Sequence, residues 1–289
     1  MTNWPQFARG NNWKIQTTSM QLSVKEKSRL KSKYGEWAVI TGASSGIGLE
    51  LAKQLADAGF NIIINSRHPD KLKAVENELR EKNNIEIIIV DADVSETSGT
   101  EKIISASQNL NVGLLVVSAG YGSSGLFIDS SIHSEINMLR VNCEALLYIT
   151  HYFSQRFATQ KRGGIILMSS MVAFQGVPYA ANYAATKAYV QCLAEALAVE
   201  MKPFGVDVLA AAPGPVESGF GLRANMNMNI SLKTSQVGVP ILKALGRKSV
   251  VLPGMLTKVL MYSLRATPRW GKIIIMQKVM QGFTKHQKN

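Results

Sequence analysis

The chain has 289 residues, 46% of them hydrophobic, with 32 Lys and Arg against 20 Asp and Glu. This length can bury one sizeable core, and the composition excludes wholesale disorder. Two cysteines, Cys143 and Cys192, exclude a disulfide framework and favour a reducing, cytoplasmic location. Residues 1–20 lack the apolar run of a secretory signal, so none is expected.

Short apolar runs alternate with helical patterns from Trp37 onward. Residues 1–33 have no clear period and are treated as an N-terminal extension, although 22–33 is compatible with a basic helix. Long helices are expected at about 133–159 and around 180–201. The expected strands are 37–41, 61–65, 85–90, 112–117, 164–169 and 206–212, with 249–252 as a candidate seventh.

Near-continuous apolar strands that alternate with helices indicate an α/β fold, in which a doubly wound parallel sheet has helices on both faces. Ligands bind beyond the carboxyl ends of such strands. Residues 163–186 carry no charge and are long enough to cross a bilayer. We reject a span there because Ser169, Ser170 and Asn182 would be costly in hydrocarbon.

A glycine-rich turn follows the first expected strand and opens the next helix. Glycine permits a tight turn and lets backbone approach a diphosphate, while the helix N-terminus supplies N–H donors. The alternative is a turn that binds nothing. The turn comprises Gly42, Ser44, Ser45, Gly46, Ile47 and Gly48.

The spacing Gly-x-x-x-Gly-x-Gly resembles the compact short-chain dehydrogenase/reductase family. In chain order, Asp93-Val94 resembles its adenine-contacting pair, and Pro213 to Ser218 resembles its Pro-Gly segment beside the nicotinamide. Val117-Ser118-Ala119-Gly120 replaces the Asn-Asn-Ala-Gly signature of the family, which puts in doubt how firmly this segment is held. Ser218 replaces the usual Thr but keeps a hydroxyl.

The resemblance covers roughly residues 36–220 and implies a single Rossmann-type domain, which we place at 34–254. It also implies a dinucleotide site. The expected cofactor-binding residues are Gly42, Ser44, Ser45, Gly46, Ile47, Gly48, Arg67, Asp93, Val94, Ala119, Gly120, Tyr183, Lys187, Pro213, Gly214 and Ser218.

The same resemblance implies a catalytic set of Asn142, Ser170, Tyr183 and Lys187. A Lys four residues after one of 8 tyrosines is nearly expected by chance. Ser170 at the end of an apolar run, together with the glycine motif, favours catalysis. Lys187 shares a helical face with Tyr183, so we expect its charge to lower the Tyr183 pKa from about 10.

Roles follow from the chemistry of carbonyl reduction. Hydride transfer to a carbonyl leaves an alkoxide, which takes a proton from Tyr183. Ser170 can hydrogen-bond the substrate oxygen as charge builds there. The family implies that Asn142 relays protons through water to Lys187; the alternative is a buried Asn that holds a helix bend.

The end of the second expected strand bears on cofactor choice. NAD-preferring relatives usually place an acid there for the ribose 2′-OH. Here the sequence is Asn65-Ser66-Arg67, and Arg67 suits a 2′-phosphate, so NADP(H) is expected. The alternative is that Arg67 is a solvated surface residue. The 4 histidines are scattered, and no metal is expected.

The net charge of +12 lies entirely beyond Glu217. Residues 255–289 form a basic amphipathic C-terminal tail, which Pro268 divides in two. Its apolar stripes favour packing on the domain or on a second subunit, or peripheral contact with an anionic membrane. The stripes are Leu256, Val259, Leu260 and Leu264, then Ile275, Met276, Val279, Met280 and Phe283.

Residues 220–245 are the expected substrate lid, and Met226, Met228, Ile230 and Leu232 favour an apolar ligand such as a steroid or acyl chain. We expect an NADP(H)-dependent oxidoreductase that interconverts a carbonyl and an alcohol, and a homo-oligomer, either dimer or tetramer. One alternative is a non-catalytic dinucleotide-binding regulator. Another is a nucleic-acid binder, which the apolar content and the lack of a recognisable module disfavour.

Overall fold

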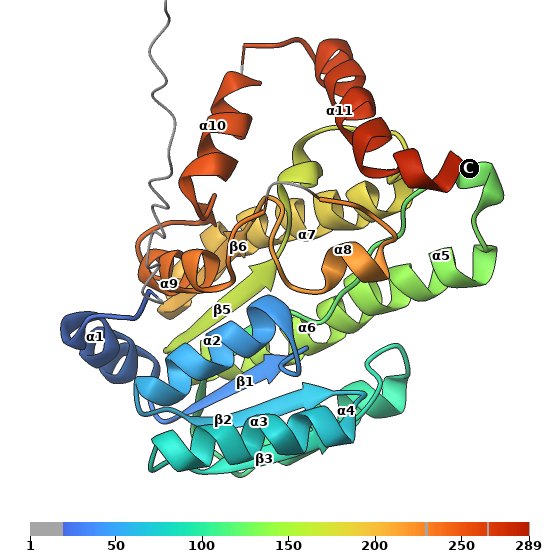
Figure 1. The fold of residues 1–289 in the computed structure, drawn as a ribbon. Coiled ribbons are helices and arrows are strands. Elements are labelled where there is room, and N and C mark those ends of the chain that lie inside the picture. The colour runs from blue at the N-terminus through green and yellow to red at the C-terminus, as the bar shows by residue number, and fades with distance from the viewer. Residues whose placement is uncertain (1–19, 229–230, 265, 289) are drawn as a thin grey trace, which may run out of the picture.

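The computed structural model describes residues 20–228, 231–264 and 266–288. In these ranges seven parallel strands form one sheet in the order β3-β2-β1-β4-β5-β6-β7 (Figure 1). The order reverses between β1 and β4, and open α/β sheets bind ligands beside such a switch point. The predicted α/β sheet is therefore confirmed. The strands are β1 (Trp37–Thr41), β2 (Asn61–Ser66), β3 (Ile87–Asp91), β4 (Val112–Val117), β5 (Gly163–Met168), β6 (Val206–Ala211) and β7 (Val250–Val251).

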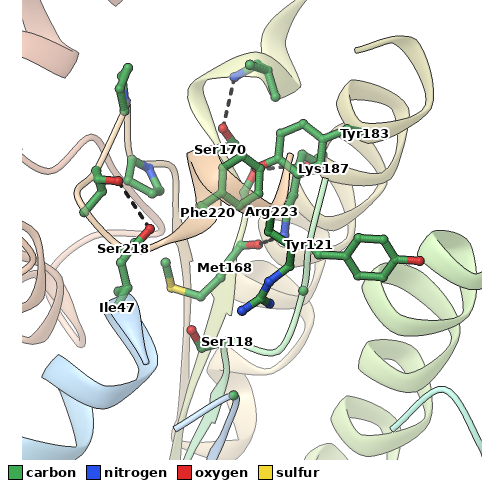
Figure 2. A pocket seen from close by; sticks show the side chains of 18 of the residues that line it. Ile47, Ser118, Tyr121, Met168, Ser170, Tyr183, Lys187, Ser218, Phe220 and Arg223 are labelled. Atoms are coloured by element: carbon green, nitrogen blue, oxygen red, sulfur yellow. Dashed lines mark hydrogen bonds between the residues drawn. The ribbon is translucent and has the colours of Figure 1, made fainter. Parts of the chain in front are cut away.

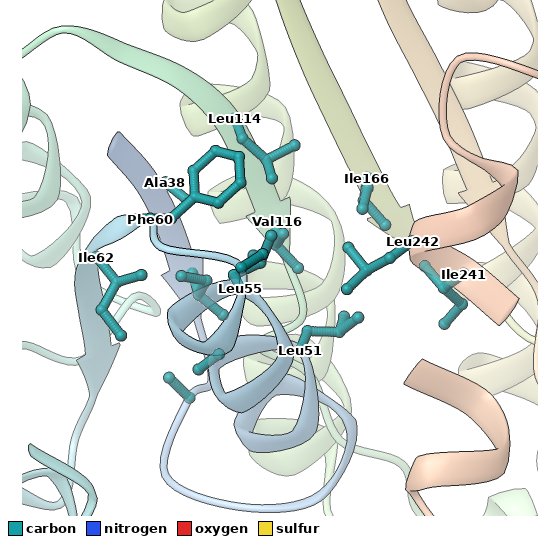
Figure 3. Close-up of a cluster of buried hydrophobic side chains, with 14 of the residues drawn as sticks. Ala38, Leu51, Leu55, Phe60, Ile62, Leu114, Val116, Ile166, Ile241 and Leu242 are labelled. Atoms are coloured by element: carbon teal, nitrogen blue, oxygen red, sulfur yellow. The ribbon is translucent and has the colours of Figure 1, made fainter. Parts of the chain in front are cut away.

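Helices cover both faces because successive side chains of a strand point to opposite sides. In β1, Ala38 and Ile40 join one apolar cluster and Val39 joins the other. Figure 3 shows the first cluster, where Leu51 and Leu55 face the sheet. The first face is covered by α1 (Val24–Tyr34), α2 (Gly46–Asp57), α3 (Pro69–Lys82) and α9 (Ser235–Ala244), and the second by α4 (Thr97–Ser107), α6 (Ala145–Gln160) and α7 (Ala181–Glu200).

The helix before the first strand packs into the domain. Leu30 and Tyr34 of α1 are fully buried, and the Tyr34 hydroxyl donates to Asp207 Oδ2 at 2.7 Å. Arg29 donates to the carbonyl oxygen of Leu245 at 2.9 Å. This part of the N-terminal extension thus contributes to the core, while residues 1–19 lie outside the described residues.

The long helix predicted at 133–159 is interrupted. It consists of α5 (Ile132–Leu139), a π-helical turn (Arg140–Glu144) and α6. Such turns widen the helix by one residue and often occur at functional sites. Asn142 lies within this turn and is 1% exposed.

The C-terminal tail forms α10 (Met255–Ser263) and α11 (Arg269–Phe283), and a short helix α8 (Phe220–Arg223) precedes them. Met276 and Met280 of α11 are buried in a cluster with Ala184 and Met226. The inner face of α11 therefore packs on the domain. In α10, Leu264 is buried at the C-cap but Val259 is 57% exposed, so the stripe predicted there is only partly covered. The Leu256 side chain and Arg265 lie outside the description.

Within the described ranges, no helix has both the length and the apolar character to cross a bilayer. Residues 163–186 form β5, a loop with a 3-10 turn (Met171–Phe174) and the start of α7.

Candidate active site

A cleft of about 380 Å³ lies beyond the carboxyl ends of the central strands. It brings together every residue predicted to bind the cofactor, from Gly42 to Ser218. Of the predicted catalytic residues, Ser170, Tyr183 and Lys187 line it (Figure 2). Asn142 does not line the cleft, although its neighbour Val141 does.

The glycine turn has the geometry of an anion cradle. Gly42 and Gly46 have φ values of 68° and 61°, which favour glycine. A Cβ on Gly42 would lie 2.8 Å from the Ala119 nitrogen, and one on Gly46 would lie 2.9 Å from the Ser218 Cβ. The Ser45 side chain makes no capping hydrogen bond to α2. The first N–H groups of α2 therefore stay available, and the turn fits a dinucleotide diphosphate.

The segment Val117 to Gly120 lacks the two Asn side chains of the family signature, and other side chains hold it in place. Thr41 Oγ1 accepts hydrogen bonds from the backbone nitrogens of Ser118 and Ala119, both at 3.1 Å. Asn142 Nδ2 donates to the Tyr121 carbonyl oxygen at 2.8 Å, and Asn142 Oδ1 accepts from the Tyr121 nitrogen at 3.1 Å. Val117-Ser118-Ala119-Gly120 is thus tied to its neighbours on both sides.

Asn142 also links this segment to α7. Its Nδ2 donates to Thr186 Oγ1 at 3.0 Å. A Cβ on Gly120 would lie 3.0 Å from Asn142 Oδ1 and 3.4 Å from Lys187 Nζ. The amide and the ammonium therefore converge on Gly120, and a side chain there would have to displace one of them.

Burial controls both titrating groups of the predicted pair. It raises the pKa of Tyr183 to about 12, a shift that a hydrogen bond with Ser170 opposes. Burial lowers the pKa of Lys187 to about 8, which the nearby Cys143 thiol opposes. The expectation that Lys187 lowers the Tyr183 pKa is not met here, since desolvation of the buried phenol is the dominant cause of its pKa. Lys187 Nζ lies 5.9 Å from the Tyr183 ring centroid.

Ser170 lies two residues after the end of β5 and faces the same space as Tyr183 (Figure 2). Its Oγ accepts a long hydrogen bond of 3.4 Å from the Val172 nitrogen, which leaves donor capacity for another partner. The Phe220 ring packs against the Tyr183 ring with centroids 5.2 Å apart. The Ser170 hydroxyl and the Tyr183 phenol therefore lie on one wall of the cleft, beside the apolar ring of Phe220.

The far end of the cleft contains Arg67. Its side chain is 50% exposed and lies 3.6 Å from Asp93 Oδ2, a loose ion pair. Asn65 also lines the cleft, but its Nδ2 is occupied, since it donates to the carbonyl oxygens of Val90 and Ala92 at 2.9 and 3.0 Å. Arg67 is the cation available at the end of β2.

Several lining residues were not singled out from the sequence, although Phe220 and Arg223 fall within the predicted lid at 220–245. Phe220 and Arg223 of α8 line the cleft, and the Gly214 nitrogen donates to the buried Thr257 Oγ1 of α10 at 3.1 Å. The predicted apolar faces of the tail were the signal that could have placed α10 and α11 here. The tail residues that line the cleft are Leu260, Ser263, Leu264, Ile275, Met276, Val279, Met280 and Phe283.

The predicted lid set is divided. Met226 and Met228 line the cleft, whereas Leu232 packs against the core on the α2 side. Ile230 lies outside the described residues. Among the residues that are described, no group of three or more His, Cys, Asp or Glu could hold a metal ion.

Comparison with known proteins agrees with this geometry. Residues 36–229 match the family model for short chain dehydrogenases. The chain is 34% identical to a 7β-hydroxysteroid dehydrogenase of Collinsella aerofaciens over 179 residues, 62% of this chain and 68% of that protein. It is 37% identical to a very-long-chain 3-oxoacyl-CoA reductase-like protein of Arabidopsis thaliana over 202 residues, 68% of this chain and 64% of that protein.

A solved structure of a 7β-hydroxysteroid dehydrogenase superposes with a TM-score of 0.79 at 28% identity, covering 86% of this chain and 98% of that one. The family model covers well over half of the chain, and its span contains the glycine turn and the residues Ser170, Tyr183 and Lys187. The chain belongs to the short-chain dehydrogenase/reductase family of oxidoreductases, which bind a nicotinamide dinucleotide.

Proposed function

We propose that this protein reduces a carbonyl group on an apolar small molecule, with NADPH as the hydride donor and Tyr183 as the proton donor. One observation carries the proposal. Ser170, Tyr183 and Lys187 face one end of a cleft whose other end is formed by the glycine turn and the α2 N-terminus. The alternative of a non-catalytic regulator gives no reason for these three residues to converge.

The bound nicotinamide supplies the hydride. The phenol of Tyr183, whose pKa is raised to about 12, stays protonated at neutral pH and can deliver its proton to the developing alkoxide. Ser170 Oγ, which hydrogen-bonds Tyr183, can donate to the same oxygen. Lys187 Nζ is held by the Met168 carbonyl oxygen at 2.8 Å, and its ammonium stabilises negative charge on Tyr183 after the proton has left.

Asn142 has a positioning role in this proposal. Its side-chain amide is occupied by Tyr121 and Thr186, so it holds the loop after β4 against α7. A buried Asn that holds the helix bend therefore also serves catalysis, because its amide keeps Gly120 beside the Lys187 ammonium. The relay of protons through water from Asn142 to Lys187, which the family implies, stays a prediction.

The preference for NADP(H) is supported by Arg67. It follows β2 at the cleft, its pairing with Asp93 is loose, and a guanidinium binds phosphate bidentately. Asn65 stands at the strand end without a carboxylate. A 2′-phosphate would thus find a cation just after β2, for which it would compete only with the loosely paired Asp93.

The apolar lining supports the substrate class. Met226, Met228, Met276 and Met280 all line the cleft and pack together with Phe220 in one apolar cluster. Methionine side chains adapt to irregular apolar shapes such as a steroid or an acyl chain. The two relatives named above act on substrates of these kinds, according to their names.

The test measures turnover with a panel of steroid, acyl and small ketones. The loss of NADPH absorbance reports the rate. We expect NADPH oxidation that depends on the ketone. A regulator would bind NADPH, with quenching of protein fluorescence, but oxidise it with no member of the panel. A nucleic-acid binder would instead shift a duplex DNA in a salt-dependent way.

We also propose that two or four copies associate. On α6, Leu147 and Tyr148 are 44% and 45% exposed, and Tyr189 on α7 is 39% exposed. Exposed apolar side chains on neighbouring elements commonly mark an interface. Light scattering of the full chain tests this, and a monomer at micromolar concentration would contradict it.

A further inference from the structure

The outer side of the tail combines exposed apolar side chains with positive charge. On α10, Met255, Val259 and Tyr262 are 74%, 57% and 62% exposed. Lys258 is also exposed and falls between them in the sequence. These four positions follow helical spacing, so they share one face. An apolar face in water has a cost unless a partner covers it.

The outer side of α11 has the same composition. Trp270 is 69% exposed and Ile274, one turn later, is 44% exposed. Lys278 follows on the same face and is exposed, as is Arg269 at the start of the helix. A tryptophan beside lysines is typical of helices that lie in a lipid headgroup region.

The loop at 126–132 extends this surface at its C-terminal end. Phe127 and Ile128 are 61% and 87% exposed. The loop is joined to the end of the chain, since Gln287 Nε2 donates to Ser124 Oγ at 2.9 Å. Figure 1 shows the C-terminus beside this loop.

Apart from the exposed Asp129 in the loop, the charge of this region favours an anionic partner. Residues 218–289 hold 12 Lys and Arg and no Asp or Glu, so no acid of the tail neutralises the exposed cations. A purely basic surface would suit any polyanion. The interleaved Met255, Val259 and Trp270 distinguish this one, because apolar side chains gain free energy in a bilayer interface and not on a hydrated polyanion.

We propose that α10, α11 and the 126–132 loop dock on an anionic lipid surface, and that the substrate is a carbonyl compound dissolved in that lipid. This proposal rests on the proposed function. The same two helices that carry the exposed face line the cleft with Leu264, Met276 and Met280. Docking would thus place one wall of the active site beside the reservoir of an apolar substrate.

The experiment uses the full chain and vesicles of phosphatidylcholine with or without phosphatidylglycerol. We expect co-sedimentation with the anionic vesicles at low salt and much less at high salt, because salt screens exposed charges. The double variant Lys258→Gln with Lys278→Gln should lower the vesicle partition coefficient about 25-fold, about fivefold for each charge removed.

An apolar variant separates lipid from other polyanions. Met255→Ser with Val259→Ser and Trp270→Ser should weaken vesicle binding at least tenfold while leaving heparin binding unchanged. The matched control is Val199→Ser with Lys202→Gln, at exposed positions beside the end of α7. It should bind vesicles like the unaltered chain.

Two results would overturn the proposal: no binding of the unaltered chain to anionic vesicles, or equal vesicle binding by the apolar variant and the control. All variants are also assayed with a water-soluble ketone, since the altered side chains lie outside the cleft. If the unaltered chain turns over a ketone but does not bind vesicles, the lipid-docking proposal is refuted and the proposed function stands. Failure to oxidise NADPH with any ketone refutes the proposed function.

Discussion

Lys187 Nζ donates a hydrogen bond of 2.8 Å to the carbonyl oxygen of Met168, the last residue of β5, and not to the phenol of Tyr183. The ammonium is thereby held at the end of β5, 5.9 Å from the Tyr183 ring centroid. The ammonium makes no hydrogen bond to the phenol, and burial is the main cause that raises the pKa of Tyr183.

Replacing Tyr183 with Phe should lower turnover at least about 100-fold, because general acid–base catalysis is typically worth that much or more. Packing against Phe220 is kept, so NADPH affinity should be nearly unchanged. Steady-state rates and fluorescence titration measure the two effects. Tyr189→Phe on the same helix is the control, and a Tyr183→Phe enzyme with full rate would end the assignment.

The pH dependence of reduction should follow Lys187. Its pKa is lowered to about 8, so the ammonium loses its proton as the pH rises through 8, while Tyr183 keeps its proton until about 12. We expect kcat/KM for reduction to fall above about pH 8. In Lys187→Arg the guanidinium does not titrate, so its residual rate should stay level there. A profile of the unaltered enzyme that is flat to pH 10 contradicts this account.

Arg67→Ala should raise KM for NADPH by about 10- to 100-fold and leave KM for NADH nearly unchanged. A hydrogen bond to a charged group contributes about 1.5–3 kcal/mol, and only the 2′-phosphate would lose it. Arg80→Ala on α3, which removes an ion pair with Glu76, serves as the control. Equal losses with both cofactors would mean that Arg67 does not contact the 2′-phosphate.

Thr257→Val should destabilise the fold by about 1–3 kcal/mol, because it leaves the Gly214 nitrogen without its side-chain acceptor. Urea denaturation measures the loss. Thr284→Val is a matched buried control, since Thr284 Oγ1 donates to the Met280 carbonyl oxygen, which the Thr284 nitrogen already bonds. Similar losses in both variants would remove any special role for Thr257.

The strands were predictable because both faces of the sheet are covered, which makes each strand a continuous apolar run such as 112–117. The cofactor turn was predictable because Gly42 and Gly46 need conformations and close contacts that only glycine allows. These features depend on local sequence. The ends of β3 and β7 were less well placed, since outer strands lose part of their apolar signal.

Long-range contacts were harder to predict. The π-helical turn at Asn142 depends on Tyr121 and Thr186, which lie 21 and 44 residues away. The amphipathic pattern of α11 indicated a buried face but not its partner, because Met276 and Met280 could equally have packed on a second subunit. The lowered pKa of Lys187 follows from burial, which no motif reveals.

Thr257 joins α10 to the segment that follows β6, and it sits between Met255 and Val259 on the same helix. The helix therefore belongs at once to the outer surface and to the cleft. Thermodynamic linkage makes such a connection reciprocal. If lipid contact orders α10 and tightens cofactor or substrate binding by some factor, then filling the cleft must strengthen lipid contact by the same factor. An enzyme of this kind would stay longest on a membrane that contains its substrate, and would leave once that substrate is consumed.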